Sequence, residues 1–145
     1  MKVLFLDYDG VINKIGGSYS TATRPGKNGI IMSEPELVYR VNLIVDRTEC
    51  EIVLSSSWRH FEDWREQMQE SGIFRPMLDR TPLRGQSRGH EIQEWLDAHP
   101  EVTRYAILDD ESDMLAGQAH SFFKTETAEG LTQEIADAVE SHLMQ

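Results

Sequence analysis

Apolar residues along the chain follow two different spacings, and these spacings predict where strands and helices lie. Short, largely continuous apolar runs occupy residues 3–6, 51–54, 105–108 and 121–123. They are rich in β-branched and aromatic residues, and we expect them to form strands. Because the runs do not alternate with polar residues, they are typical of strands buried on both faces of a parallel sheet.

Between the expected strands, apolar residues recur at intervals of three and four, which predicts amphipathic helices. The first helix follows Ser33-Glu34-Pro35-Glu36, a capping-box pattern with proline in the first turn. The others contain Phe61, Trp64 and Met68 before Gly72, Ile92, Trp95 and Leu96 before Pro100, and Ile135, Ala136 and Val139 after a Thr132 cap. Alternating strands and helices predict an α/β fold, in which helices cover both faces of a mostly parallel sheet.

The composition is that of one globular domain spanning residues 1–145, with 39% hydrophobic and 27% charged residues. A formal net charge of −11 argues against a broad basic surface for nucleic acid, but it is compatible with a local basic pocket. The single cysteine, Cys50, cannot form an internal disulfide, and no apolar run approaches the roughly 20 residues of a membrane span. We therefore expect a soluble, cytoplasmic protein that does not bind membranes.

Two segments depart from the alternation of strands and helices. Residues 13–32 are rich in Gly, Ser and Thr. This composition predicts a loop or short hairpin that forms a flap over the functional site. Residues 75–89 contain Pro and Arg and predict a second loop.

Polar residues directly follow three of the expected strands. Asp7 and Asp9 follow the first strand, residues 55–59 (SSSWR) follow the second, and residues 109–113 (DDESD) follow the third. Arg88 stands at the start of the helix that leads to the third strand. Since ligands of parallel sheets bind at the carboxyl ends of the strands, we expect these residues to form one site.

The pair Asp7 and Asp9 requires a compensating charge. Two ionised carboxylates about 4 Å apart repel each other by roughly 4 kcal/mol at an effective dielectric of about 20. Carboxylate ligands without His or Cys favour a hard cation, Mg²⁺ before a transition metal. A hydroxyl and an arginine would complete a cradle for a phosphate group, and Asp7 could then attack phosphorus to form an aspartyl-phosphate.

Four motifs, in order along the chain, resemble those of the haloacid dehalogenase (HAD) superfamily. FLDYDGVI resembles its first signature, IVLSSS its second and ILDDESD its fourth, while GLT at residues 130–132 is similar to the tail of the family. SSSWR and RGHEIQEWL also resemble a small branch of phosphatase-like domains, including domains of RNA-repair proteins. The resemblance implies a Rossmann-like three-layer α/β/α sandwich, and the short intervals between motifs leave no room for a large cap domain.

The resemblance also implies roles for individual residues. Asp7 would attack phosphorus, Asp9 would protonate the leaving group and then activate water, and Ser55 would bind phosphoryl oxygens. Mg²⁺ would be held by Asp7, the backbone carbonyl of Asp9, and Asp109. Two further carboxylates are available to support the metal, Asp110 and Asp113, and the sequence leaves open which of them does so.

The third motif of the family normally contributes a lysine, but no lysine occurs between Lys27 and Lys124. Arg88 is the best substitute, and Arg84 is the alternative. An arginine brings a permanent charge with forked donors in place of a point charge.

Other residues near the predicted site have less distinctive patterns. For Arg59 the sequence leaves two roles open, binding of substrate or pairing with an acid. Ser56 is a further candidate for substrate binding, whereas we expect Ser57 to be a helix cap. We expect the three tryptophans to lie in the core.

Together these features favour an Mg²⁺-dependent phosphatase that hydrolyses phosphomonoesters, with phosphorylated small molecules as its main substrates. One alternative is an end-processing phosphatase that acts on nucleic-acid termini, which the RNA-repair branch favours and the net charge of −11 opposes. A second alternative is a non-catalytic domain that binds a metal or a partner. The intact pair Asp7 and Asp9 argues against this second alternative, since nothing structural requires both carboxylates.

Overall fold

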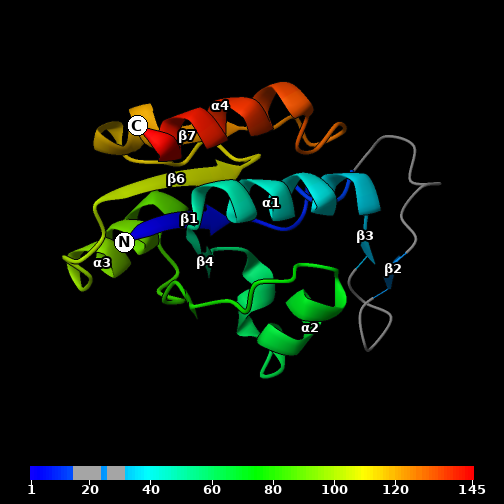
Figure 1. Ribbon diagram of the computed structural model, residues 1–145. Helices are drawn as coiled ribbons and strands as arrows, with labels where there is room; N and C mark the ends of the chain where they lie inside the picture. The colour runs from blue at the N-terminus through cyan, green and yellow to red at the C-terminus, as the bar shows by residue number, and fades with distance from the viewer. Residues whose placement is uncertain (15–23, 26–31) are drawn as a thin grey trace.

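The computed structural model describes residues 1–14, 24–25 and 32–145 (Figure 1). Two two-residue strands, β2 (Arg24–Pro25) and β3 (Met32–Ser33), pair antiparallel within the segment that we expect to form a flap. Residues 15–23 and 26–31 of that expected flap lie outside the described residues.

The main sheet has five strands in the order β5-β4-β1-β6-β7, and every neighbouring pair is parallel. The strands are β1 (Lys2–Leu6), β4 (Glu51–Leu54), β5 (Asp79–Arg80), β6 (Arg104–Asp109) and β7 (Phe122–Lys124). Four of them confirm the expected strands. The fifth, β5, lies in an expected loop, because two residues are too short to show a hydrophobic pattern.

The order of the strands places a topological switch point between β1 and β6. From β1 the chain builds the sheet outward through β4 and β5, and then returns to place β6 on the other side of β1. In open α/β sheets the crevice at such a point, outside the carboxyl ends of the strands, is where ligands bind. Asp7 and Asp109 stand at this crevice.

Successive residues of the central strands point to opposite faces of the sheet, and each face carries its own hydrophobic core. Leu4 and Leu6 face a cluster that includes residues of α1 (Pro35–Thr48), α2 (Trp64–Glu70) and α4 (Gln133–Met144). Val3 and Phe5 face α3 (Arg88–Asp97), where the rings of Phe5 and Trp95 meet edge to face, 5.5 Å between centroids.

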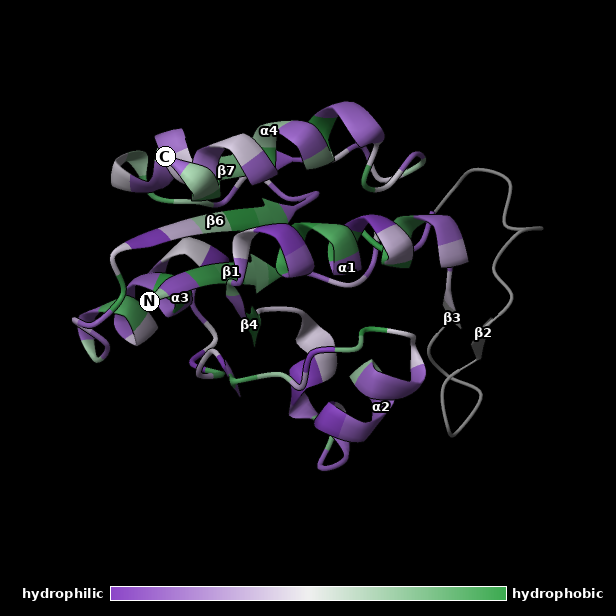
Figure 2. Cartoon of the chain, viewed as in Figure 1, coloured by the Kyte–Doolittle hydropathy of each residue, from purple (hydrophilic) through white to green (hydrophobic). Residues whose placement is uncertain are grey.

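The layers agree with the predicted sandwich. Figure 1 shows α1 and α4 side by side along the sheet, and in Figure 2 most of β1 and the middle of β6 are green, the hydrophobic colour. Two short 3₁₀ helices complete the described fold, η1 (Ser57–His60) and η2 (Ala116–Ser121). Within the described residues, no helix has both the length and the apolar character that a membrane crossing requires.

Of the two N-terminal caps that the sequence predicts, the cap of α4 is confirmed and the capping box of α1 is wrong. Thr132 caps α4, since its hydroxyl accepts a hydrogen bond from the backbone N–H of Ile135. The expected capping box before α1 does not form, because the N-cap is Glu34 and the Ser33 hydroxyl instead donates to the Ser71 carbonyl. Burial of Ser33 in the interior therefore overrides its local capping preference.

The second helix is shorter than expected. It begins at Trp64, so that Phe61 lies before it, at the end of η1. There the Phe61 ring stacks on Trp58, 5.3 Å between centroids, which provides apolar contact without a helix.

Candidate active site

Three carboxylates meet at the switch point of the sheet. Asp7 follows β1, Asp109 ends β6 and Asp110 comes next, and each offers an oxygen within 4.8 Å of the other two. The backbone N–H of Asp7 donates to the Leu108 carbonyl at 3.0 Å, which fixes the two strand ends relative to each other. Asp7 is 4% exposed and Asp109 is fully buried.

Burial makes the charges of this cluster unfavourable without a cation. It raises the pKa of the Asp7 carboxyl well above its ordinary value, neighbouring Asp109 raises it further, and the Arg88 guanidinium offsets this only in part. Burial also raises the pKa of Asp109, again against the charge of Arg88. A divalent cation would supply the missing positive charge, and carboxylate oxygens are the ligands that Mg²⁺ prefers. The residues present therefore fit a magnesium site.

Arg88, the substitute that we expect for the missing lysine, lies against two of the three carboxylates. Its Nη1 lies 2.9 Å from Asp7 Oδ1 and 2.6 Å from Asp109 Oδ2. The alternative, Arg84, points elsewhere: it pairs with Glu94 at 3.1 Å, and 58% of its side chain is exposed. The geometry thus favours Arg88 of the two arginines.

Asp113 contacts the helix that carries Arg88, whereas Asp110 belongs to the carboxylate cluster. The Asp113 carboxylate accepts a hydrogen bond from the Arg88 backbone N–H at 2.9 Å, and its carbonyl accepts one from Gly89. A side chain at Gly89 would meet the backbone of Leu115 at 2.6 Å. Glycine therefore lets the start of α3 approach the acidic loop closely.

Gly10 of the DYDG motif is required for two reasons. Its backbone has φ of +80°, which residues with a side chain rarely adopt. A Cβ at this position would also lie 2.3 Å from Asp110 Oδ2. The glycine thus brings the first motif against the second carboxylate of the ILDDESD motif.

Asp9 lies apart from the three clustered carboxylates and is held by two neutral donors. Asn13 Nδ2 donates to Asp9 Oδ1 at 2.9 Å, and Trp58 Nε1 donates to Asp9 Oδ2 at 2.8 Å. The Asn13 side chain also accepts from the Gly10 backbone N–H. Trp58 packs against the core, as expected, but its contact with Asp9 could not be predicted, because it depends on how η1 packs over the first motif.

The three serines after β4 have three different environments. Ser55 is fully buried next to the end of β1, and its hydroxyl has no hydrogen-bond partner among the described residues. An unsatisfied buried hydroxyl costs about 1–3 kcal/mol, which a bound phosphoryl oxygen could offset. Ser56 caps η1 by accepting from the Trp58 backbone N–H, the role expected of Ser57, and its contact with substrate stays a prediction.

Ser57 instead borders the cavity over the site. This open cavity of about 340 Å³ is lined by Asp7, Asp9, Ser57, Arg88, Asp110, Glu111 and Thr127. A larger hollow of about 670 Å³ lies around Phe74 and Arg75, away from the clustered carboxylates. We place the site in the smaller cavity, because Asp7, Asp110 and Arg88 of the charged cluster line it.

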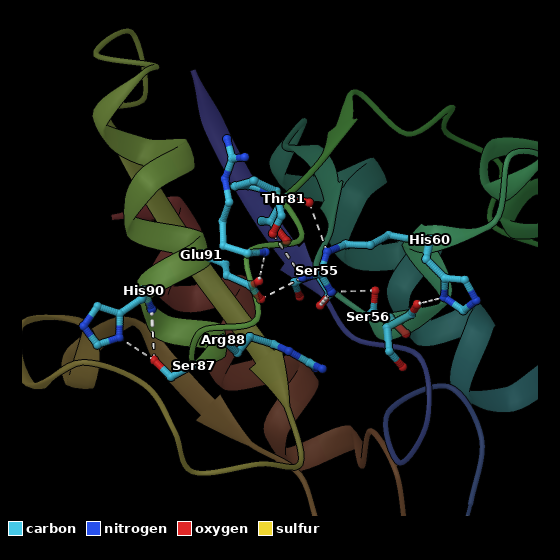
Figure 3. Close-up of polar contacts among 12 residues, drawn as sticks. Ser55, Ser56, His60, Thr81, Ser87, Arg88, His90 and Glu91 are labelled. Carbon is cyan, nitrogen blue, oxygen red and sulfur yellow. Dashed lines mark hydrogen bonds and ion pairs between the residues drawn. The ribbon is translucent and has the colours of Figure 1, made fainter.

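Arg59 lies beneath the site and is 3% exposed. Its five N–H groups donate to the backbone carbonyls of Ser55, Ser56, Thr81 and Pro82 and to the carboxylate of Glu91, 2.7 Å away. Figure 3 shows Ser55, Ser56, Thr81 and Glu91 gathered around these contacts. Of the two roles left open for Arg59, the structure shows the ion pair. Its donors face protein atoms, so we do not expect it to bind substrate.

This arrangement gives a prediction for stability. Arg59→Ala should lower the free energy of unfolding by about 3–5 kcal/mol, because it leaves Glu91 as a buried, uncompensated charge. Urea denaturation of the two proteins measures this difference. The matched control is Arg84→Ala, which removes an exposed ion pair and should cost less than about 1 kcal/mol. Equal losses for both variants would contradict a structural role specific to Arg59.

Comparison with known protein families identifies the family of the chain. A family model described as the HAD domain in Swiss Army Knife RNA repair proteins matches residues 3–136. The chain belongs to this family. No curated protein and no solved structure gives a significant match. The match confirms the resemblance carried by the four motifs, and the parallel five-stranded sheet is that of a HAD domain without a large cap.

Proposed function

We propose that this HAD domain is an Mg²⁺-dependent phosphatase that hydrolyses phosphomonoesters through an aspartyl-phosphate on Asp7. The observation that carries the proposal is the joint placement of Asp7, Arg88 and the unpartnered hydroxyl of Ser55 at one sheet edge. A nucleophile, a fixed positive charge and a free donor are the groups that phosphoryl transfer needs.

In the first step, an oxygen of Asp7 forms a bond to phosphorus as the bond to the leaving oxygen breaks. Asp9, in its acid form, gives its proton to that leaving oxygen, and the alcohol departs. Arg88 and Ser55 donate to the phosphoryl oxygens, whose negative charge they stabilise. A magnesium ion held by Asp7, Asp109 and the Asp9 carbonyl, with Asp110 in support, would neutralise charge on the phosphoryl oxygens.

In the second step, Asp9 takes a proton from water, whose oxygen attacks phosphorus. The bond between phosphorus and Asp7 breaks, inorganic phosphate is released, and Asp9 holds the proton needed for the next cycle. Atoms and charges therefore balance over the two steps.

A direct test measures hydrolysis of 4-nitrophenyl phosphate with and without metal. We expect turnover with Mg²⁺ and none after dialysis against EDTA, because the clustered carboxylates repel one another without a cation. Mg²⁺ should also raise the thermal unfolding midpoint, which is a readout independent of substrate. Undiminished turnover in EDTA would contradict metal dependence, and absence of turnover with Mg²⁺ on all phosphate esters would favour a non-catalytic metal-binding domain.

A second candidate, a phosphatase of nucleic-acid ends, is favoured by the RNA-repair description of the family. The cavity opens to solvent, so a polymer end could enter it. Against this stand the net charge of −11 and the acidic side chains of Asp110 and Glu111 in the cavity wall. Faster hydrolysis of a 3′- or 5′-phosphorylated oligonucleotide than of small esters, with competition weakened by salt, would support the second candidate.

A further inference from the structure

The carboxylate of Asp9 is held from two sides. Asn13 Nδ2 and Trp58 Nε1 each donate to a different oxygen, at 2.9 and 2.8 Å. A carboxylate has about four acceptor sites, so both oxygens keep a free lone pair for a proton. The two bonds thus fix the direction of the carboxylate without blocking proton transfer.

The Trp58 ring is itself fixed. It stacks on Phe61 at 5.3 Å between centroids and contacts the tilted ring of Tyr8 at 6.2 Å. The backbone N–H of Trp58 donates to the Ser56 hydroxyl, and the Tyr8 hydroxyl shares a hydrogen bond with Ser71 at 2.8 Å. These contacts hold the ring in the position from which its Nε1–H group donates to Asp9.

We infer that Trp58 is a positioning residue for Asp9, an inference that rests on the general acid–base role of Asp9 proposed above. An indole N–H can only donate, so it cannot take the Asp9 proton, and its part is to hold the carboxyl group in place. General acid catalysis needs the carboxyl within about 2.6–3.2 Å of the leaving oxygen, and a misplacement of about 1 Å can cost on the order of 10²-fold in rate. Asn13 shares this task, so loss of Trp58 should be milder than loss of Asp9.

The chain contains a matched control for this contact. Trp95 Nε1 donates to Asp79 Oδ2 at 2.8 Å, the same kind of bond at the same length. Trp95 packs against the core on the α3 face, and neither residue of this pair lines the active-site cavity. Trp95→Phe therefore measures what loss of an indole N–H to a carboxylate does elsewhere in the domain.

Trp58→Phe should lower kcat on an alkyl phosphate by about 10–100-fold, up to the loss expected when a catalytic group is misplaced by about 1 Å. KM should stay nearly unchanged, and formation of the aspartyl-phosphate from 4-nitrophenyl phosphate should slow far less, because nitrophenolate leaves without a proton. Trp95→Phe should leave kcat within about twofold, with any destabilisation visible in thermal unfolding. In an Asp9→Asn background, Trp58→Phe should cause almost no further loss.

Indole N–H resonances in NMR spectra test the contact without any turnover. The three tryptophans give three such signals, assigned from the Trp→Phe variants. Asp9→Ala should shift the Trp58 signal and speed its exchange with water, while the Trp95 signal stays in place.

The outcomes separate the inference from the proposed function. In an active enzyme, equal kinetic losses for Trp58→Phe and Trp95→Phe, or full additivity with Asp9→Asn, would overturn the inference and leave the phosphatase assignment intact. An inactive wild-type protein would overturn the proposed function, and the NMR spectra would then decide whether Trp58 holds Asp9. A Trp58 signal unaffected by Asp9→Ala would overturn the inference in either case.

Discussion

Asp7→Asn is expected to reduce turnover by at least about 10⁴-fold, because an amide cannot attack phosphorus. Loss of a covalent nucleophile in a well-studied protease costs on the order of 10⁶-fold, which sets the scale. The amide keeps the shape of the carboxylate that it replaces at this buried position, so we expect the fold to persist. Steady-state hydrolysis of 4-nitrophenyl phosphate with Mg²⁺ measures the loss.

The same variant should be more stable than the wild type when metal is absent. Burial and Asp109 raise the pKa of Asp7 in the folded state, so ionised Asp7 opposes folding. This penalty is absent below the ordinary pKa of an aspartate, and it grows as the pH rises toward the raised pKa of the folded state. In EDTA, the stability advantage of Asp7→Asn should therefore be small near pH 4 and increase toward neutral pH, as measured by thermal unfolding.

Two controls make this result decisive. Asp46→Asn removes a carboxylate that is exposed on α1, and it should change neither turnover nor the pH dependence of stability. Mass spectrometry must exclude hydrolysis of the introduced amide back to a carboxylate. Near-normal turnover by Asp7→Asn with its amide intact would remove Asp7 from the role of nucleophile.

The fold was predictable where the chain buries long apolar runs. Strands β1, β4 and β6 are central in the sheet, so both of their faces need apolar residues, and the sequence shows this directly. The edge strand β5 has only two residues and left no such pattern. The capping box before α1 failed for a different reason, since Ser33 is buried and bonds to Ser71, a partner that local sequence does not reveal.

In the candidate site, too, some features could be predicted from the sequence and others could not. Asp7 follows β1 and Asp109 ends β6, and because these two strands pair in parallel, the topology predicts that the two carboxylates meet. The position of Arg88 beside Asp7 and Asp109 agrees with its expected place at the start of the helix that leads to β6. The contact between Trp58 and Asp9 depends on how the η1 turn packs over the first motif, a detail of tertiary packing that hydrophobic pattern does not encode.

Asp9→Asn should depress hydrolysis of an alkyl phosphate by about 10²–10⁴-fold, the usual contribution of a positioned acid or base. Alkoxide is strongly basic and needs a proton to leave, whereas 4-nitrophenolate does not. Formation of the aspartyl-phosphate from 4-nitrophenyl phosphate should therefore be affected much less. Comparing the two leaving groups separates loss of the acid from a general loss of the site.

The same variant should also lose the second role of Asp9, activation of water, so phosphorylated Asp7 should accumulate. Rapid-quench measurements with 4-nitrophenyl phosphate should show a burst followed by slow release, with the phosphate mapped to Asp7. Asp110→Asn is the matched control: Asp110 belongs to the carboxylate cluster, so its loss should weaken Mg²⁺ binding and slow both leaving groups alike. If Asp9→Asn also slowed hydrolysis with both leaving groups to the same extent and trapped no intermediate, Asp9 would act by supporting the metal. The acid–base role would then belong to another group.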